Sequence, residues 1–193
     1  RPTEFEASVN TVNGAQISFD ISLGDFVSDP HYLVVISGPA VGNWESIISQ
    51  EGNSLNLEES IVGLSAGDTV EVRKYWTLSS LLGAPPPSLT NEGTSSPEFF
   101  ILLNDLTGAG TNRSPSRVFA YYSSPVIVDG WYNNGTLAIS NDQPLSPESF
   151  LTVRNGSNEP IELAFSGEVM QNEFSLRVIR RSLGSQDNYL LNP

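Results

Sequence analysis

Turn-forming residues punctuate this 193-residue chain about every 8–12 positions, and this spacing constrains the fold more than any other feature. Between the turns lie short apolar runs rich in Val, Ile, Leu and Phe, each long enough for a strand and too short for most helices. Roughly a dozen such runs favour two packed antiparallel sheets. We therefore predict an all-β fold, a two-sheet antiparallel sandwich of jelly-roll or Greek-key type, formed as a single domain over residues 1–193.

Three turn sequences predict hairpins within this pattern. Asn13-Gly14 combines residue types that readily adopt positive φ, as a type I′ turn requires, and alternating apolar side chains precede and follow it. Two later turns that contain Gly have the same setting. The hairpins are predicted around Asn13-Gly14 (strands 5–9 and 17–21), Glu51-Gly52-Asn53 (44–49 and 54–57) and Asn155-Gly156-Ser157-Asn158 (150–154 and 161–165).

One segment departs from the strand pattern. Thr77 is a good N-cap and Gly83 a good C-cap, and three leucines between them are spaced to share one helical face. We therefore predict a short helix over 77–83. Three prolines at 85–87 then end it and open a Pro-rich loop or insertion at 84–97.

The composition excludes several classes of function. Because the chain has no Cys, it has no thiolate metal site and no Cys nucleophile. Its net charge of −13 at pH 7 disfavours nucleic acid and anionic membranes as partners. No apolar run approaches the roughly 18 residues of a transmembrane segment, and the first residue is Arg1 rather than Met. We therefore expect a secreted, extracellular protein associated with the cell surface.

Two features match parts of catalytic sites. Residues 63–67 have the G-x-S-x-G pattern that would place Ser65 at a nucleophile elbow, but an elbow needs a following helix, and residues 69–72 have a strand pattern. His31 is the only histidine, and it lies upstream, at a turn before an apolar strand. Because neither feature has its catalytic partners, we expect no enzymatic activity.

No cofactor is expected from the sequence. Calcium is the one ion that the many Asp and Asn oxygens in loops leave open, although no loop has the EF-hand pattern. The pairs Asn104-Asp105 and Asn141-Asp142 are therefore predicted to be ordinary turn residues.

Aromatic residues offer an alternative function, because flat rings can stack on sugars. Core packing is the competing role of the same side chains. The candidate glycan contacts are Trp44, Trp76, Trp131 and Tyr132.

Three N-x-S/T sequons are candidate glycosylation sites. All three lie in predicted loops, where an acceptor Asn is accessible. They begin at Asn112, Asn134 and Asn155.

Charge is spread unevenly along the chain. Residues 1–100 hold 13 acidic and 3 basic side chains, whereas residues 101–193 hold 9 and 6. Arg177, Arg180 and Arg181 concentrate positive charge near the C-terminus. This cluster is either a solvated strand face or a basic surface that meets the acidic body of a neighbouring subunit.

Both tails of the sequence have strand-like patterns. Either tail could add a strand to the sheet edge of a neighbour, and pairing of both tails within the chain is an equal alternative. The residues concerned are Phe5, Ala7 and Val9 near one end and Tyr189, Leu190 and Leu191 near the other.

Eight segments carry a resemblance through their order and spacing: 35–44, 66–72, 75–78, 121–122, 130–132, 151–154, 166–169 and 186–189. Together they resemble an uncharacterised family of secreted, β-rich bacterial proteins known chiefly from Verrucomicrobia. The resemblance covers about residues 35–190, implies export and an extracellular role, and brings no catalytic residues with it.

These observations favour a secreted structural subunit of the cell surface. We expect it to self-assemble head-to-tail into a filament or surface layer by strand addition through a terminal tail, as a homo-oligomer or polymer. The alternative is a carbohydrate-binding or adhesin module.

Overall fold

The computed structural model describes residues 2–84, 99–104, 115–124, 127–147, 150–156, 160–165, 174–178 and 186–191. The strand pairings among them are antiparallel, which confirms the all-β class. We predicted one domain, whereas the chain divides into two compact units, Arg1–Tyr75 and Trp76–Pro193. The physical reason is that the buried apolar residues form two separate clusters, one in each unit.

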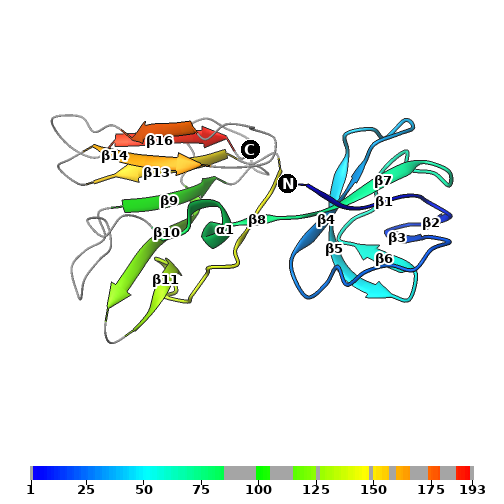
Figure 1. Cartoon of the computed structure of the whole chain (residues 1–193), viewed down its shortest axis with the longest axis horizontal. Coiled ribbons are helices and arrows are strands. Elements are labelled where there is room, and N and C mark those ends of the chain that lie inside the picture. The colour runs from blue at the N-terminus through cyan, green and yellow to red at the C-terminus, as the bar shows by residue number, and fades with distance from the viewer. Residues whose placement is uncertain are drawn as a thin grey trace. The chain divides into compact units, whose positions relative to one another are not determined.

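Unit 1 contains seven strands in one sheet (Figure 1). The order across the sheet is β1-β7-β4-β5-β6-β3-β2. Their bounds are β1 Thr3–Ser8, β2 Thr11–Asn13, β3 Gln16–Ser18, β4 His31–Val35, β5 Trp44–Glu51, β6 Ser54–Leu57 and β7 Thr69–Lys74.

The first segment of the chain pairs with both ends of this sheet. β1 pairs with β7 and β2 pairs with β3, yet only Val9 and Asn10 separate β1 from β2. Val9 is bound on both sides, because its N–H donates to the Asp68 carbonyl at 2.8 Å and its own carbonyl accepts from Gly67 N–H at 2.8 Å. Residues 3–13 therefore close the sheet on itself.

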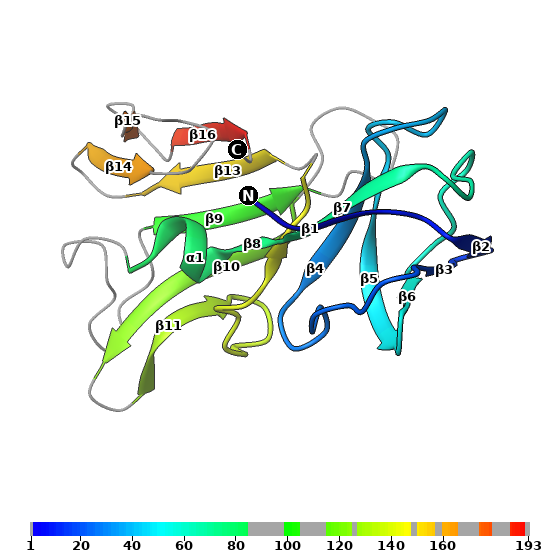
Figure 2. The same cartoon turned by 45° about the vertical axis from the view of Figure 1, so that its right-hand side comes forward.

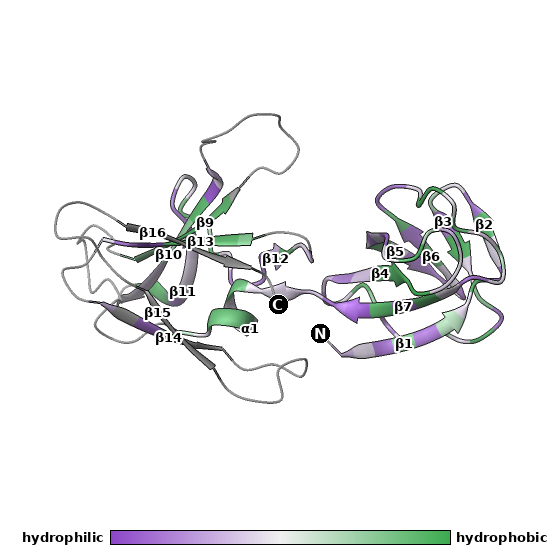
Figure 3. Cartoon of the chain, turned by 90° about the horizontal axis from the view of Figure 1, so that it is seen from above, coloured by the Kyte–Doolittle hydropathy of each residue, from purple (hydrophilic) through white to green (hydrophobic). Residues whose placement is uncertain are grey.

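The core of unit 1 follows the strand period of two. Leu33 and Val35 of β4 and Val70 and Val72 of β7 are at most 1 % exposed, and they alternate with more polar or more accessible neighbours. Figure 3 shows the same alternation of apolar and polar residues along β7. Each strand thus contributes one face to a single apolar cluster.

One predicted hairpin of unit 1 forms from its predicted strands, whereas the other predicted turn joins different strands. The turn at 51–53 joins β5 to β6 as predicted, with Glu51 paired to Ser54. At the first turn the predicted pairing of strands 5–9 and 17–21 is wrong, because β1 pairs with β7 and the turn joins β2 to β3. Asn13 pairs with Gln16 there, so the loop residues are Gly14 and Ala15. The positive φ of 62° lies on Gly14, the first loop position, which is the type II′ pattern and not the predicted type I′.

Unit 2 contains a five-stranded sheet of order β11-β10-β9-β13-β16 and two two-stranded ladders, β8-β12 and β14-β15 (Figure 2). The element bounds are β8 Trp76–Thr77, α1 Leu78–Leu82, β9 Phe99–Asn104, β10 Pro115–Ser124, β11 Ile127–Asn133, β12 Pro144–Leu145, β13 Phe150–Asn155, β14 Ile161–Phe165, β15 Phe174–Val178 and β16 Gln186–Leu191.

The predicted helix at 77–83 is confirmed as α1. Thr77 is its N-cap and forms a capping box with Ser80, while Gly83 is its C-cap with φ 60°. Leu78 and Leu81 enter the core, where the Trp131 indole N–H donates to the Gly83 carbonyl at 2.9 Å. The predicted loop at 84–97 lies outside the described residues from residue 85 on.

The third predicted hairpin is wrong. β13 pairs with β9 and β16, whereas β14 pairs with β15. Leu151, Thr152 and Val153 are consecutive and all buried, which fits a central strand covered on both faces. Because both edges of β13 are occupied by distant strands, neither edge is left for its neighbour in sequence.

Trp131 should be a main determinant of unit 2 stability. Replacing this fully buried residue by Ala should lower the free energy of unfolding by about 3–5 kcal/mol, because it leaves a cavity and an unpaired Gly83 carbonyl. Calorimetry measures the loss in free energy of unfolding for Trp131→Ala and for the control Tyr132→Phe, which should lose much less. An equal, small loss in both variants would contradict the assigned role.

Candidate functional site

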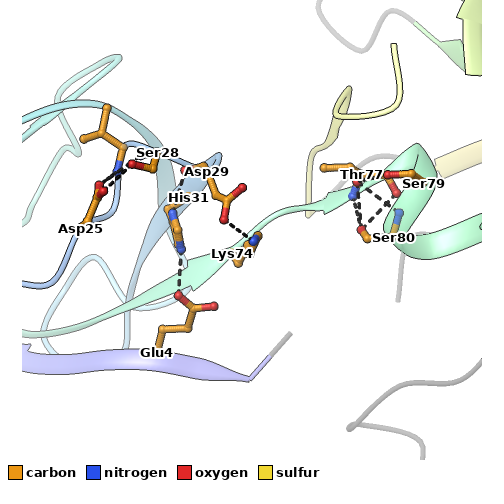
Figure 4. A network of polar contacts seen from close by, with 10 residues as sticks. Glu4, Asp25, Ser28, Asp29, His31, Lys74, Thr77, Ser79 and Ser80 are labelled. Carbon is orange, nitrogen blue, oxygen red and sulfur yellow. Dashed lines mark hydrogen bonds and ion pairs between the residues drawn. The ribbon is translucent and has the colours of Figure 1, made fainter. Parts of the chain in front are cut away.

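A β-bulge at the start of β1 brings Glu4 to the only histidine. Thr3 pairs with Arg73 and Phe5 with Val72, so Glu4 is the extra residue of the bulge. Its carboxylate Oε2 lies 2.8 Å from Nε2 of His31 (Figure 4). The bulge thus ties β1 to β4, with which it does not pair.

His31 is 3 % exposed and has both ring nitrogens in contact with acceptors. Nδ1 lies 2.8 Å from the Asp29 carbonyl oxygen, and because a carbonyl only accepts, this contact is a hydrogen bond in the tautomer that carries its proton on Nδ1. In a neutral imidazole with that proton, Nε2 is an acceptor, as is the Glu4 carboxylate. The contact is therefore a hydrogen bond only when the pair holds one further proton.

One further polar contact and one aromatic contact lie beside this pair, and Figure 4 shows the polar one. The Lys74 ammonium binds the Asp29 carboxylate, and this hydrogen bond holds the pKa of Asp29 below its ordinary value. Lys74 is also the register partner of His31 across β4 and β7. On the apolar side, the Phe26 ring meets the imidazole edge-on with centroids 5.4 Å apart.

Asp25 organises the loop that leads to His31. Its carboxylate accepts from the Ser28 hydroxyl and from the backbone N–H groups of Val27 and Ser28, the latter two at 3.0 and 3.1 Å. These hydrogen bonds lower the pKa of Asp25 to about 2. Since its oxygens serve the loop itself, Asp25 is a structural residue of the site.

An open depression of about 550 Å³ adjoins this loop. Asp25 is the only ionisable residue among those that line it, and its carboxylate accepts the donors of its own loop. The lining residues are Leu23, Gly24, Asp25, Val27, Ser49, Gln50 and Gly52.

The geometry makes His31 a structural link. Both ring nitrogens are engaged and the ring is buried, so removing a proton from a substrate would require the Glu4 contact at Nε2 to break and the substrate to reach a buried nitrogen. The contacts of His31 with Glu4 and with the Asp29 carbonyl join β1, β4 and the 25–31 loop, and the one with Glu4 depends on a proton. Local sequence patterns missed Glu4, because 27 residues separate it from His31 and only the strand order brings them together.

Ser65 lies in an exposed turn that leads into β7. Its N–H donates to the Asp68 carboxylate at 2.9 Å, and Asp68 N–H donates to the Ser65 carbonyl at 3.1 Å. The segment after it is a strand, so the structural context of a nucleophile elbow is absent at Ser65.

The candidate glycan contacts are not brought together on one surface of either unit. Trp131 is fully buried, so its predicted sugar contact is wrong, because core packing takes the ring. Trp44, in unit 1, meets Tyr32 and Tyr75 edge-on at 6.1 and 6.4 Å. In unit 2, Trp76 is half-buried against the core, and Tyr132 is half-buried and meets Tyr122 edge-on at 5.6 Å.

The aromatic group around Trp44 has one perturbed phenol. Tyr75 is 3 % exposed, and its hydroxyl lies 3.0 Å from that of Ser46. Burial raises the pKa of Tyr75 to about 12. This phenol stays neutral at physiological pH and serves packing.

Both predicted tails pair within the chain. Phe5 and Ala7 are half-buried in β1, and Val9 is 2 % exposed in the core. In β16 the residues Tyr189, Leu190 and Leu191 are register partners of Thr152, Leu151 and Phe150. The alternative of intramolecular pairing is therefore the one observed.

The predicted basic cluster is only partly described. Arg177 lies in β15 opposite Glu162 of β14, whereas Arg180 and Arg181 lie outside the described residues. The proposed basic surface therefore stays a prediction.

The three sequons have different settings. Asn134 is exposed in the turn after β11, which fits an acceptor site. Asn155 is fully buried at the end of β13, so its prediction as an accessible loop residue is wrong, because the strand extends through it. Asn112 lies outside the described residues.

Within the described ranges, no three His, Asp or Glu side chains are grouped as metal ligands. In the predicted turn pair Asn141-Asp142, the Asn141 side-chain amide oxygen accepts from the backbone N–H of Trp131 at 2.8 Å. In the other pair, Asp105 lies outside the described residues. No helix in the same part of the chain is long and apolar enough to span a membrane.

Comparisons with protein-family models, with curated proteins and with solved structures each found no match to this chain. The resemblance to the secreted Verrucomicrobia family stays a prediction.

The Asp25 carboxyl should titrate at about pH 2, because three donors stabilise its ionised form. Its folded-state pKa is depressed, so this stabilisation is present above the ordinary value of 3.8 and is lost as the pH falls toward 2. Ser28→Ala removes one donor and should raise the pKa in an NMR titration, whereas Ser22→Ala should not. Equal pKa values in both variants would rule out the Ser28 contribution.

Proposed function

We propose that this protein is a non-catalytic, secreted structural subunit of the cell surface that assembles by exchanging β1 between copies. The observation that supports this most directly is the place of β1 in its sheet. β1 ends the strand order of unit 1 and pairs with β7 alone. It can leave β7 without breaking any other strand ladder in the described part of unit 1.

A second copy offers β1 an identical place. The edge of β7 presents Val70 and Val72 as the register partners of Ala7 and Phe5. Every copy has the same sequence, so β1 of one copy regains these contacts on β7 of another, which is the logic of domain swapping. The connection through Val9 and Asn10 is the segment that would change conformation.

The β1–β7 pairing also contains a destabilising element. Glu6 is the register partner of Glu71, and like charges directly opposite each other weaken a strand pair by a fraction of a kcal/mol to about 1 kcal/mol. Arg73 partly relieves this, because its Nε donates to Glu71 at 2.8 Å. β1 is therefore held firmly enough to close the sheet and loosely enough to exchange.

Exchange in one direction gives a head-to-tail contact. Each copy donates β1 to one neighbour and accepts β1 from another, and such heterologous contacts propagate into filaments unless the rotation closes a ring. This is the self-assembling arrangement expected of a surface structural subunit. The carbohydrate-binding alternative has less support, since Trp131 is buried and the other candidate rings are half-buried.

Cysteines in register positions test the exchange directly, because the natural chain has none. Ser8 and Thr69 are register partners of β1 and β7, and opposed antiparallel residues lie within the Cα range of a disulfide. A mixture of Ser8→Cys protein and Thr69→Cys protein should form a disulfide-linked heterodimer under mild oxidation. When β1 of one copy lies on β7 of another, the two thiols are held in register, so this bond should form faster than by random collision.

The matched control mixes Ser8→Cys with Ser60→Cys, since Ser60 is exposed outside the strands. Mass spectrometry distinguishes the heterodimer from both homodimers. If the Thr69 mixture gives no more heterodimer than the Ser60 mixture, and light scattering shows a monomer at high concentration, the proposed function is wrong.

A further inference from the structure

We propose that the Glu4–His31 contact is a proton-dependent latch on β1, so that pH controls when this strand can leave β7. The latch itself follows from the described contacts, whereas its consequence for assembly rests on the proposed function. The juxtaposition that carries it is a bulged carboxylate on β1 against a buried imidazole at the start of β4.

The latch depends on the proton because no other donor is available between the two groups. A neutral imidazole has one ring proton, and in the tautomer that donates to the Asp29 carbonyl this proton is on Nδ1, 2.8 Å from that oxygen. Without a second proton, the Nε2 lone pair and the Glu4 carboxylate face each other 2.8 Å apart as two acceptors. That arrangement is repulsive, and the 3 % exposed imidazole is poorly placed to gain a water in exchange.

The other charged groups near His31 are already committed. They come from the loop before β4 and from β7: the Asp25 carboxylate is held by its own loop, and the Asp29 carboxylate is bound by Lys74. Both acids have lowered pKa values, so they stay ionised well into the acidic range. Glu4 of β1 is thus the group whose contact with His31 changes when a proton is lost.

The sign of the pH effect follows from counting protons. With the latch closed, Glu4 and His31 hold one proton between them beyond that on Nδ1. In the open state that proton has lost its second partner and is held less firmly, so the closed latch binds more protons than the open state. Raising the pH therefore favours the open state, and acid favours the closed one. β1 should be locked at about pH 5.5 and released at about pH 8.

Hydrogen exchange of the dilute monomer measures the latch without any assembly. After correction for the intrinsic pH dependence of amide exchange, residues 3–8 should exchange about ten-fold faster at about pH 8 than at about pH 5.5, as expected for loss of a charge-assisted hydrogen bond. Amides of β5 and β6, on which β1 does not lie, should show no such change.

Glu4→Gln isolates the proton as the cause. The amide N–H of the substituted side chain can donate to the neutral Nε2, and its amide oxygen can accept from the protonated Nε2, so the contact persists at both pH values. Protection of β1 should then be independent of pH. Glu6→Gln is the matched control, because it removes the same charge from an exposed position of the same strand and should keep the wild-type pH dependence.

The outcomes separate the latch from the proposed function. Equal protection of β1 at both pH values in the wild type, or a pH dependence that survives Glu4→Gln, overturns the latch. If Glu4→Gln does not fold, nitrogen NMR of the wild-type imidazole replaces it, and loss of the Nε2 proton must coincide with faster exchange of β1. Opening of β1 at high pH without any heterodimer between copies leaves the latch standing and removes the assembly function.

Discussion

Closure of the unit 1 sheet by residues 3–13 is the constraint on which the rest of that unit depends. A sheet of this kind presents unpaired N–H and C=O groups at each edge, and one segment satisfies groups at both, through β7 and through β3. The crossing at Val9 fixes the turn before β7, because Gly67 and Asp68 both bond to it. The same crossing places the bulge of β1 beside the start of β4, and so determines which carboxylate His31 meets.

The charge balance of unit 1 explains why a histidine occupies this position. Residues 1–75 contain 11 acidic and 3 basic side chains, and Arg73 and Lys74 are already paired with Glu71 and Asp29. A carboxylate at Glu4 then has no permanent cation among the described residues near it. The His31 imidazole is the group that lies against it, with Nε2 2.8 Å from the Glu4 carboxylate. An acidic unit therefore acquires a pH-sensitive contact where a Lys or Arg would give a permanent one.

Sequence patterns predicted correctly the features that residues close in sequence determine, such as a helix cap and a tight turn. The N-cap at Thr77 and the turn at Gly52 involve residues within four positions of each other, and both occur as expected. The hairpin around Gly156 failed because distant strands occupy both edges of β13, which no short window reveals. The contact between Glu4 and His31 was not predicted for the same reason, since two strand pairings and a bulge bring these residues together. Turn residues determine where the chain reverses. Which strands then pair depends on how apolar side chains from distant parts of the chain pack together.

Closure of the sheet and the proposed exchange between copies require opposite strengths of the β1–β7 pairing, and the proposed latch supplies each under a different condition. A strand that closes its own sheet too firmly cannot be donated, whereas one that is too loose leaves the apolar edge of β7 exposed to indiscriminate pairing. The opposed Glu6 and Glu71 lower the affinity at every pH at which both are ionised, so they cannot serve as a control. Only a contact that is attractive in one protonation state and repulsive in the other can hold β1 under one condition and release it under another. In the described part of unit 1, the Glu4–His31 pair is the contact with that property, because it joins two acceptors through a single exchangeable proton.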